Sequence, residues 1–93
     1  MEEKVRVHVI IHGRVQGVFF RMETRRAADA YGVYGWVRNR PDGTVEAIFE
    51  GDRSRVDQIL GWCETGPSLS VVKHVDRVWG AYAGEFETFE VTD

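Results

Sequence analysis

Residues 5–31 read VRVHVIIHGRVQGVFFRMETRRAADAY, and within this stretch the hydrophobic pattern changes its period. Up to residue 11, apolar residues alternate with polar ones, which predicts a half-buried strand. The apolar positions of this strand are Val5, Val7, Val9 and Ile11. From Phe20 to Tyr31 the apolar and small residues recur at helical spacing, and Gly32 is a natural stop for that helix. The segment between strand and helix contains Gly13 and Gly17, so the sequence predicts a strand–loop–helix junction.

The next part of the chain predicts a β-hairpin. Residues 34–39 and 44–50 have the composition of strands, and Pro41-Asp42-Gly43 lies between them. Proline presets the backbone angle at the first turn position, and glycine accepts a positive φ at the exit. Asn39 therefore stands at the end of the second strand, directly before the turn.

The remaining residues predict one more helix and two more strands. Asp52 or Ser54 is expected to cap the helix, with Asp57 as the capping-box partner of Ser54. The apolar stripe of this helix consists of Val56, Ile59, Leu60 and Cys63, and Gly66-Pro67 ends it. Residues 71–79 predict a fourth strand whose imperfect alternation indicates a bulge, and residues 86–91 a short closing strand.

This order, β-α-β-β-α-β with a small β tail, predicts an α+β fold. Two helices on one face of an antiparallel sheet would form a ferredoxin-like split βαβ sandwich. In that arrangement the first two strands run parallel with another strand between them, so their C-terminal ends lie at the same edge. We therefore expect Asn39 to meet the loop after the first strand. No linker or low-complexity stretch interrupts residues 1–93, which are expected to form a single domain.

The composition narrows the possible partners. The 93 residues are 43% hydrophobic and 29% charged, which is typical of a globular protein, and the net charge is −3. A negative chain is a poor ligand for nucleic acid or an anionic membrane, and no apolar run approaches the roughly 20 residues of a membrane span. The charged start Met1-Glu2-Glu3-Lys4 is unlike a signal peptide, and the single cysteine, Cys63, fits a reducing compartment. We expect a cytoplasmic protein, and a monomer.

The loop after the first strand has features of an anion site. A strand-to-helix junction offers free backbone N–H groups at the positive end of a helix dipole, and Gly17 allows those groups to converge. Arg21, at the start of the helix, can add a planar set of donors that matches phosphate oxygens. The loop follows neither the Walker pattern nor the dinucleotide pattern, so nothing implies ATP or NAD. Taken alone, two glycines in such a loop more often form an ordinary turn, and an asparagine at the end of a strand is usually a turn residue.

Two segments together resemble the signatures of the acylphosphatase family. They are GRVQGVFFR at residues 13–21 and GWVRNRPDGTVEA at residues 35–47. The Gly51-Asp52 step into the second helix and the order of elements also match, so the resemblance covers nearly the whole chain. It implies an enzyme that hydrolyses the carboxyl-phosphate anhydride of small acyl phosphates to a carboxylate and inorganic phosphate, with no metal and no organic cofactor.

The resemblance also implies roles for particular residues. Arg21 matches an essential phosphate-binding arginine and Asn39 a water-orienting asparagine, which makes these two the predicted catalytic residues. The predicted cradle for the substrate phosphate consists of Val15, Gln16, Gly17, Val18, Phe19, Phe20 and Arg21. Neither motif contains a strong general base, so the substrate's own phosphate is a candidate to accept the proton of the attacking water.

Several alternatives compete with this interpretation. His8, His12 and His74 lack the spacing of metal ligands, and the first two belong to the polar side of a strand. RNA-recognition modules share the order of elements, but they need aromatic residues on two strands that are aromatic-poor in this chain. A regulatory module of the same fold would need neither Arg21 nor Asn39. Acylphosphatase-like segments also occur in larger maturation factors that handle carbamoyl phosphate, and the length of this chain favours a free-standing enzyme.

Overall fold

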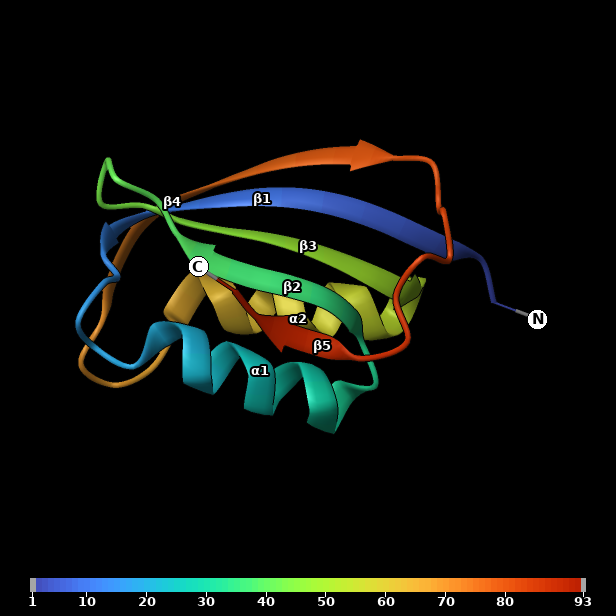
Figure 1. Ribbon diagram of the computed structural model, residues 1–93, viewed down its shortest axis with the longest axis horizontal. Coiled ribbons are helices and arrows are strands. Elements are labelled where there is room, and N and C mark those ends of the chain that lie inside the picture. The colour runs from blue at the N-terminus through green and yellow to red at the C-terminus, as the bar shows by residue number, and fades with distance from the viewer. Residues whose placement is uncertain (1, 93) are drawn as a thin grey trace.

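Two helices pack against one face of a five-stranded sheet in the computed structural model, which describes residues 2–92 (Figure 1). The elements are β1 (Lys4–Arg14), α1 (Phe20–Tyr31), β2 (Tyr34–Asn39), β3 (Val45–Asp52), α2 (Arg53–Thr65), β4 (Val71–Gly80) and β5 (Phe89–Val91). This order confirms the predicted α+β, ferredoxin-like arrangement. Within the described residues, neither helix combines the length and the apolar character that crossing a membrane requires.

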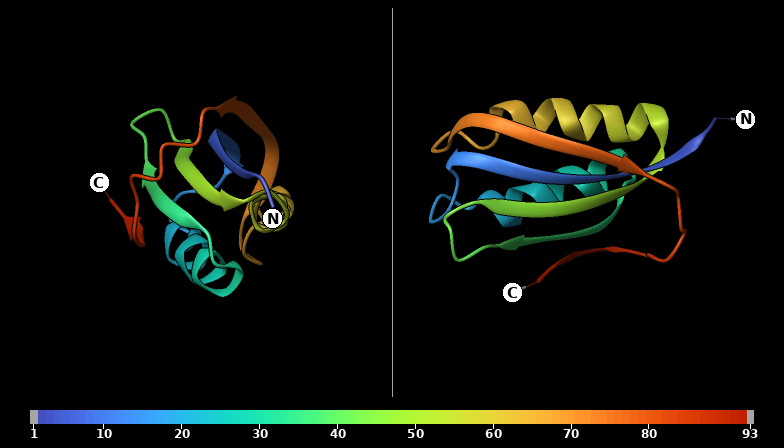
Figure 2. Two further views of the ribbon diagram at one scale, coloured as in Figure 1. Left: turned by 90° about the vertical axis from the view of Figure 1, so that its right-hand side faces the viewer. Right: turned by 90° about the horizontal axis from the view of Figure 1, so that it is seen from above.

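The strands lie in the order β4-β1-β3-β2-β5 (Figure 2). Strand β1 pairs antiparallel with β3 and β4, and β2 pairs antiparallel with β3, as predicted. Strand β5 pairs with β2 in parallel, so the sheet is mixed rather than purely antiparallel. The cause is the route of the chain. After β4, which runs opposite to β2, the chain crosses to the other edge of the sheet and turns back, and it then has the direction of β2.

The alternation of residues 5–11 separates the two faces of the sheet. Val7, Val9 and Ile11 are fully buried against the helices, whereas Arg6 and His8 are on the face without helices. The core between sheet and helices also contains large side chains from α1, β3, α2 and β5, namely Phe20, Phe49, Ile59, Leu60 and Phe89. Burial of each such side chain stabilises the fold by about 1.5–3 kcal/mol.

The helix ends confirm one expectation and correct another. Gly32 adopts a left-handed conformation (φ 73°) after α1, as predicted for a C-terminal stop. At the start of α2, Asp52 is the N-cap residue, but its side chain accepts a hydrogen bond from Lys4 Nζ at 2.9 Å instead of one from the helix. The expected Ser54–Asp57 capping box is wrong, because the N–H of Ser54 donates to Glu2 Oε1 at 2.6 Å.

The predicted bulge in β4 is confirmed. His12 lies opposite His74 and Gly13 opposite Val72, so Lys73 is an extra residue on β4. Gly13 has φ 130°, and a Cβ atom there would lie 2.1 Å from the carbonyl oxygen of Val71. Only glycine permits this close approach of β1 and β4 just before the chain enters the next loop.

Candidate active site

The loop of residues 15–19 and the C-terminal end of β2 lie at the same end of the sheet (Figure 1). A cleft of about 480 Å³ opens between them. Its lining comes from the loop, α1, β2 and β5, and consists of Val15, Gly17, Phe19, Phe20, Arg21, Met22, Arg25, Asn39 and Val91. The expectation that Asn39 meets the loop after β1 is therefore confirmed, and Arg21 lines the same cleft.

The loop is held by apolar side chains that point inward. Val15, Val18 and Phe20 are almost completely buried in the core between the sheet and the helices. Gly17 has φ 73° with no atom near its missing side chain, so the backbone conformation, and not lack of space, favours glycine here. Phe19 also has a positive φ, 65°, and is the only non-glycine residue among residues 2–92 that does.

The backbone amides of this loop are available to a ligand. Among residues 2–92, no hydrogen bond is donated by the N–H groups of residues 16–19. The first N–H groups of an α-helix have no partner within the helix, and α1 begins at Phe20 without a side-chain cap. Free amides together with the positive end of the helix dipole favour an anion at this position.

The side chain of Gln16 joins the loop to the β2–β3 hairpin. Its Nε2 donates to the carbonyl oxygen of Arg40 at 2.7 Å and to that of Thr44 at 2.8 Å. The same two residues close the turn, since the N–H of Arg40 donates to the carbonyl of Thr44 at 2.9 Å. Gln16 therefore fixes the position of the loop relative to the turn that follows Asn39. The resemblance to known signatures implied only a cradle role for Gln16, and no local sequence pattern signals its contact with the hairpin.

The turn itself is stabilised by Asp42. Its Oδ1 accepts hydrogen bonds from the hydroxyl of Thr44 at 2.6 Å and from the N–H of Thr44 at 3.0 Å. These two hydrogen bonds keep the pKa of the Asp42 carboxyl below its ordinary value. Asn39 precedes this turn as the last residue of β2, opposite Val45. Among the described residues, no hydrogen bond involves the Asn39 carboxamide, so both its oxygen and its nitrogen can serve a ligand or a water.

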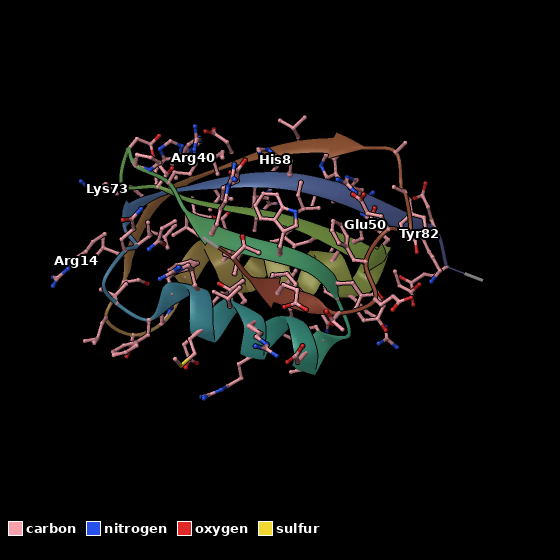
Figure 3. All side chains as sticks on the ribbon, viewed as in Figure 1. His8, Arg14, Arg40, Glu50, Lys73 and Tyr82 are labelled. Carbon is pink, nitrogen blue, oxygen red and sulfur yellow. The ribbon has the colours of Figure 1, made fainter. Side chains whose placement is uncertain are left out.

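The cleft is electropositive. Arg21 is half-buried in the first turn of α1, and no carboxylate within the described part of the chain forms an ion pair with it. Arg25 follows one turn later, and its Nε lies 4.0 Å from Asp29. Figure 3 shows three further cations at this end of the molecule, Arg14, Arg40 and Lys73. Within residues 2–92, the charged side chains that line the cleft are the guanidinium groups of Arg21 and Arg25, which attract an anion.

The other groups that could carry chemistry lie outside the cleft. His8 Nε2 is 2.6 Å from Glu46 Oε2 on the face without helices, and His12 and His74 both contact Asp76. Cys63 is fully buried in α2, where loss of hydration raises the pKa of its thiol to about 12. Within residues 2–92, no group of three or more His, Cys, Asp or Glu residues has an arrangement that could hold a metal ion.

Three residues that line the cleft were not predicted as part of the site: Met22, Arg25 and Val91. Met22 and Arg25 follow Arg21 on α1, and a helical projection from Arg21 would have placed Arg25 on the same side. Val91 reaches the cleft because β5 returns beside β2, and that pairing was not predicted.

Known proteins resemble this chain in both sequence and fold. Residues 7–91 match the sequence profile of the acylphosphatase family. An acylphosphatase of Pelotomaculum thermopropionicum is 51% identical over 88 residues, which are 95% of this chain and 96% of the relative. The solved acylphosphatase of Coxiella burnetii superimposes with a TM-score of 0.91 at 31% identity and covers 96% of this chain and 93% of its own. The acylphosphatase of Bacillus subtilis gives a TM-score of 0.92 at 29% identity, with 96% and 99% covered.

Proposed function

The chain belongs to the acylphosphatase family, whose activity is the hydrolysis of acyl phosphates, and we propose that it performs this reaction in the cleft between residues 15–19 and Asn39. One observation carries the assignment of the site. The loop with the unpaired amides, Arg21 and Asn39 all line a single cleft, and among the described residues no hydrogen bond or ion pair occupies the amides of residues 16–19, the guanidinium of Arg21 or the carboxamide of Asn39.

The loop and Arg21 bind the phosphoryl group. Two or three non-bridging oxygens accept hydrogen bonds from the amides of residues 16–20, and the guanidinium of Arg21 neutralises much of the remaining charge. These donors are held in place before the substrate arrives, by the buried side chains of the loop and by Gln16. Fixed donors aimed at an oxyanion lower the barrier because no reorganisation is needed in the transition state.

Asn39 positions the attacking water. Its carboxamide oxygen accepts a hydrogen bond from the water, whose oxygen then forms a bond to phosphorus while the bond from phosphorus to the acyl oxygen breaks. The carboxylate leaves with the electron pair of that bond, and one proton of the water passes to a phosphoryl oxygen. The products are a carboxylate and inorganic phosphate. A carboxylate is a weak base, so the leaving group needs no protonation, and positioning with charge stabilisation is sufficient.

We propose that residues 1–93 act as one monomeric domain in the cytoplasm, without a metal or an organic cofactor. Nucleic acid is not a partner, because Glu46 and Glu50 occupy the centre of the face without helices, where an RNA-binding sheet would present aromatic residues.

Hydrolysis of benzoyl phosphate in excess chelator tests the proposal. We expect undiminished turnover with EDTA and competitive inhibition by inorganic phosphate. Asn39→Ala should lower kcat by about a hundredfold or more, the scale of losing one aligned polar group, with little change in the inhibition constant of phosphate. Arg21→Ala should lower kcat and, unlike Asn39→Ala, should also raise the inhibition constant of phosphate. Gln58→Ala, an exposed substitution on α2, is the control. A folded Asn39→Ala protein with wild-type kcat would contradict the role of Asn39.

A further inference from the structure

The cleft is larger than the proposed chemistry requires. A volume of about 480 Å³ lies in the range of sites that enclose whole small molecules, roughly 300–1,000 Å³. The phosphoryl group and one water occupy only the part beside the loop amides, Arg21 and Asn39. The rest of the cleft is therefore next to the acyl group of the bound substrate.

This remaining part has an apolar wall. Phe19 is 66% exposed, Met22 57% and Val91 38%, so each keeps a large apolar surface open to the cleft. They come from three separate segments, namely the loop, α1 and β5. Isolated exposed apolar residues are common on protein surfaces, but three that converge on one concave site form a surface suited to an apolar ligand.

Val91 is the member of this wall that comes from the strand paired with β2, the strand that ends at Asn39. Strand β5 pairs in parallel with β2, and Val91 is the partner of Val37, two residues before Asn39. The N–H of Thr92 donates to the carbonyl of Val37 at 2.9 Å, which secures the end of β5 in this position. The short C-terminal strand therefore contributes a side chain to the site in addition to closing the sheet.

We infer that Phe19, Met22 and Val91 form an acyl subsite that selects acyl phosphates with an apolar, and especially an aromatic, acyl group. The inference rests on the proposed function, because the acyl chain reaches this wall only if its phosphoryl group is bound by the loop. Contact with the wall removes apolar surface of both the acyl group and the three side chains from water, which favours benzoyl over acetyl.

Arg25 offers an alternative to the apolar wall, because it could bind an acyl group that carries a negative charge. Among the described residues it is the only charged residue of the lining besides Arg21, and its pairing with Asp29 at 4.0 Å is long and largely exposed. An acyl group that carried its own carboxylate could bind there. We favour the apolar group because three side chains provide the wall, while the charge of Arg25 is hydrated and partly offset by Asp29.

The test compares three substrates across matched variants. Benzoyl phosphate, acetyl phosphate and 4-carboxybenzoyl phosphate are hydrolysed by wild type, Met22→Gln, Val91→Thr and the double variant. Both substitutions keep the approximate size of the side chain and add a polar group. Val78→Thr on β4 is the control, because Val78 is an exposed valine of a strand outside the cleft. Inorganic phosphate is tested as an inhibitor of every variant.

The expected result is a loss of discrimination. The ratio of kcat/KM for benzoyl phosphate to that for acetyl phosphate should fall about threefold to tenfold in each single variant, mainly through KM, and further in the double variant. The inhibition constant of phosphate should stay unchanged, and Val78→Thr should behave as wild type.

Two results would overturn the inference while the proposed function stands. One is an equal change for benzoyl and acetyl phosphate in the variants, with phosphate still a competitive inhibitor. The other is a preference of the wild type for 4-carboxybenzoyl phosphate that Arg25→Gln abolishes, which would assign the subsite to charged acyl groups. Failure of the proposed function would look different, because phosphate would then inhibit no variant and Asn39→Ala would be fully active.

Discussion

Two residues of the 15–19 loop determine its geometry by opposite means. Gln16 supplies hydrogen bonds that hold the loop to the hairpin, and Phe19 adopts a backbone conformation that is unfavourable for a side chain. The hydrogen bonds of Gln16 stabilise the folded protein, whereas the backbone conformation of Phe19 destabilises it. Both residues lie where the phosphoryl group is proposed to bind. Strain of this kind is found where a site needs a particular backbone shape.

Replacing Gln16 by glutamate tests the link between loop and hairpin. Gln16→Glu keeps the shape of the side chain but places an acceptor against the carbonyls of Arg40 and Thr44. We expect a loss of about 2 kcal/mol in the free energy of unfolding at neutral pH, measured by urea denaturation. The loss should shrink in acid, where the protonated carboxyl can donate one hydrogen bond. Gln58→Glu on the exposed side of α2 should show no such effect, and a similar loss there would contradict the explanation.

The strain at Phe19 predicts a reversal of the usual order of glycine and alanine. At ordinary positions alanine is more stabilising than glycine by roughly 0.5–1 kcal/mol, but a left-handed conformation costs a Cβ-bearing residue about 1–2 kcal/mol. We therefore expect Phe19→Gly to have a higher free energy of unfolding than Phe19→Ala, by about 1 kcal/mol, and to unfold at a higher urea concentration. Since both variants lack the ring, the comparison isolates the backbone. Greater stability of the alanine variant would show that residue 19 is unstrained.

At the scale of elements, β1, β2 and β3 carry a charged network on the face away from the helices. Glu46 of β3 accepts hydrogen bonds at 2.6 Å from His8 of β1 and at 2.6 Å from Arg38 of β2. Burial alone would raise the pKa of Glu46, but the hydrogen bonds from His8 and Arg38 outweigh it, and the pKa lies below its ordinary value of 4.5. Three neighbouring strands are thus joined through one carboxylate, on the strand that leads away from the Asn39 turn.

This network predicts a particular pH dependence of stability. A carboxyl whose pKa is lower in the folded state stabilises the protein above its unfolded pKa, and this contribution disappears as the pH falls through the folded pKa. Urea denaturation at pH values from about 6 to about 3 should therefore show a loss of stability below about pH 4.5 in wild type and a smaller loss in Glu46→Gln. Glu87→Gln, at an exposed position, should keep the wild-type profile. Identical profiles for all three proteins would contradict a stabilising role of Glu46.

At the scale of the whole molecule, the charge is distributed unevenly. The net charge is −3, yet Arg21 and Arg25 line the cleft, and Arg14, Arg40 and Lys73 lie at the same end of the molecule (Figure 3). Among residues 2–92, neither Arg14 nor Lys73 forms an ion pair, and both are exposed. A local positive field of this kind attracts an anionic substrate in spite of the negative total.

The uneven charge predicts that the reaction depends on salt. The value of kcat/KM for acetyl phosphate should fall as ionic strength rises, and Arg14→Gln and Lys73→Gln should each lower it about twofold at low salt and little at high salt, with kcat unchanged. Lys4→Gln, at the opposite end of β1, is the control. A salt dependence that is the same in all variants would mean that these cations do not attract the substrate.

The outline of the fold and the main parts of the site could be predicted because they rest on local patterns. The alternation from Val5 to Ile11, the helical spacing from Phe20 and the turn at Pro41-Asp42-Gly43 each reflect a preference of neighbouring residues. The meeting of the loop after β1 with Asn39 followed from topology, since parallel strands end at the same edge of a sheet. The catalytic roles of Arg21 and Asn39 are still predictions, which the kinetic measurements described above test.

What the sequence by itself determined was the order and type of the elements, the residues that face the core, and the loop with free amides before a helix. Only the tertiary structure decided that β5 pairs in parallel with β2 and that Glu2 caps α2. It also decided that Gln16 reaches the hairpin and that Met22 and Val91 line the cleft. The physical reason is the separation along the chain of the residues that interact. Periodicity and turn propensity act between residues a few positions apart, whereas these contacts join segments that approach each other only after the whole chain has packed, and nothing in the local sequence encodes the partner.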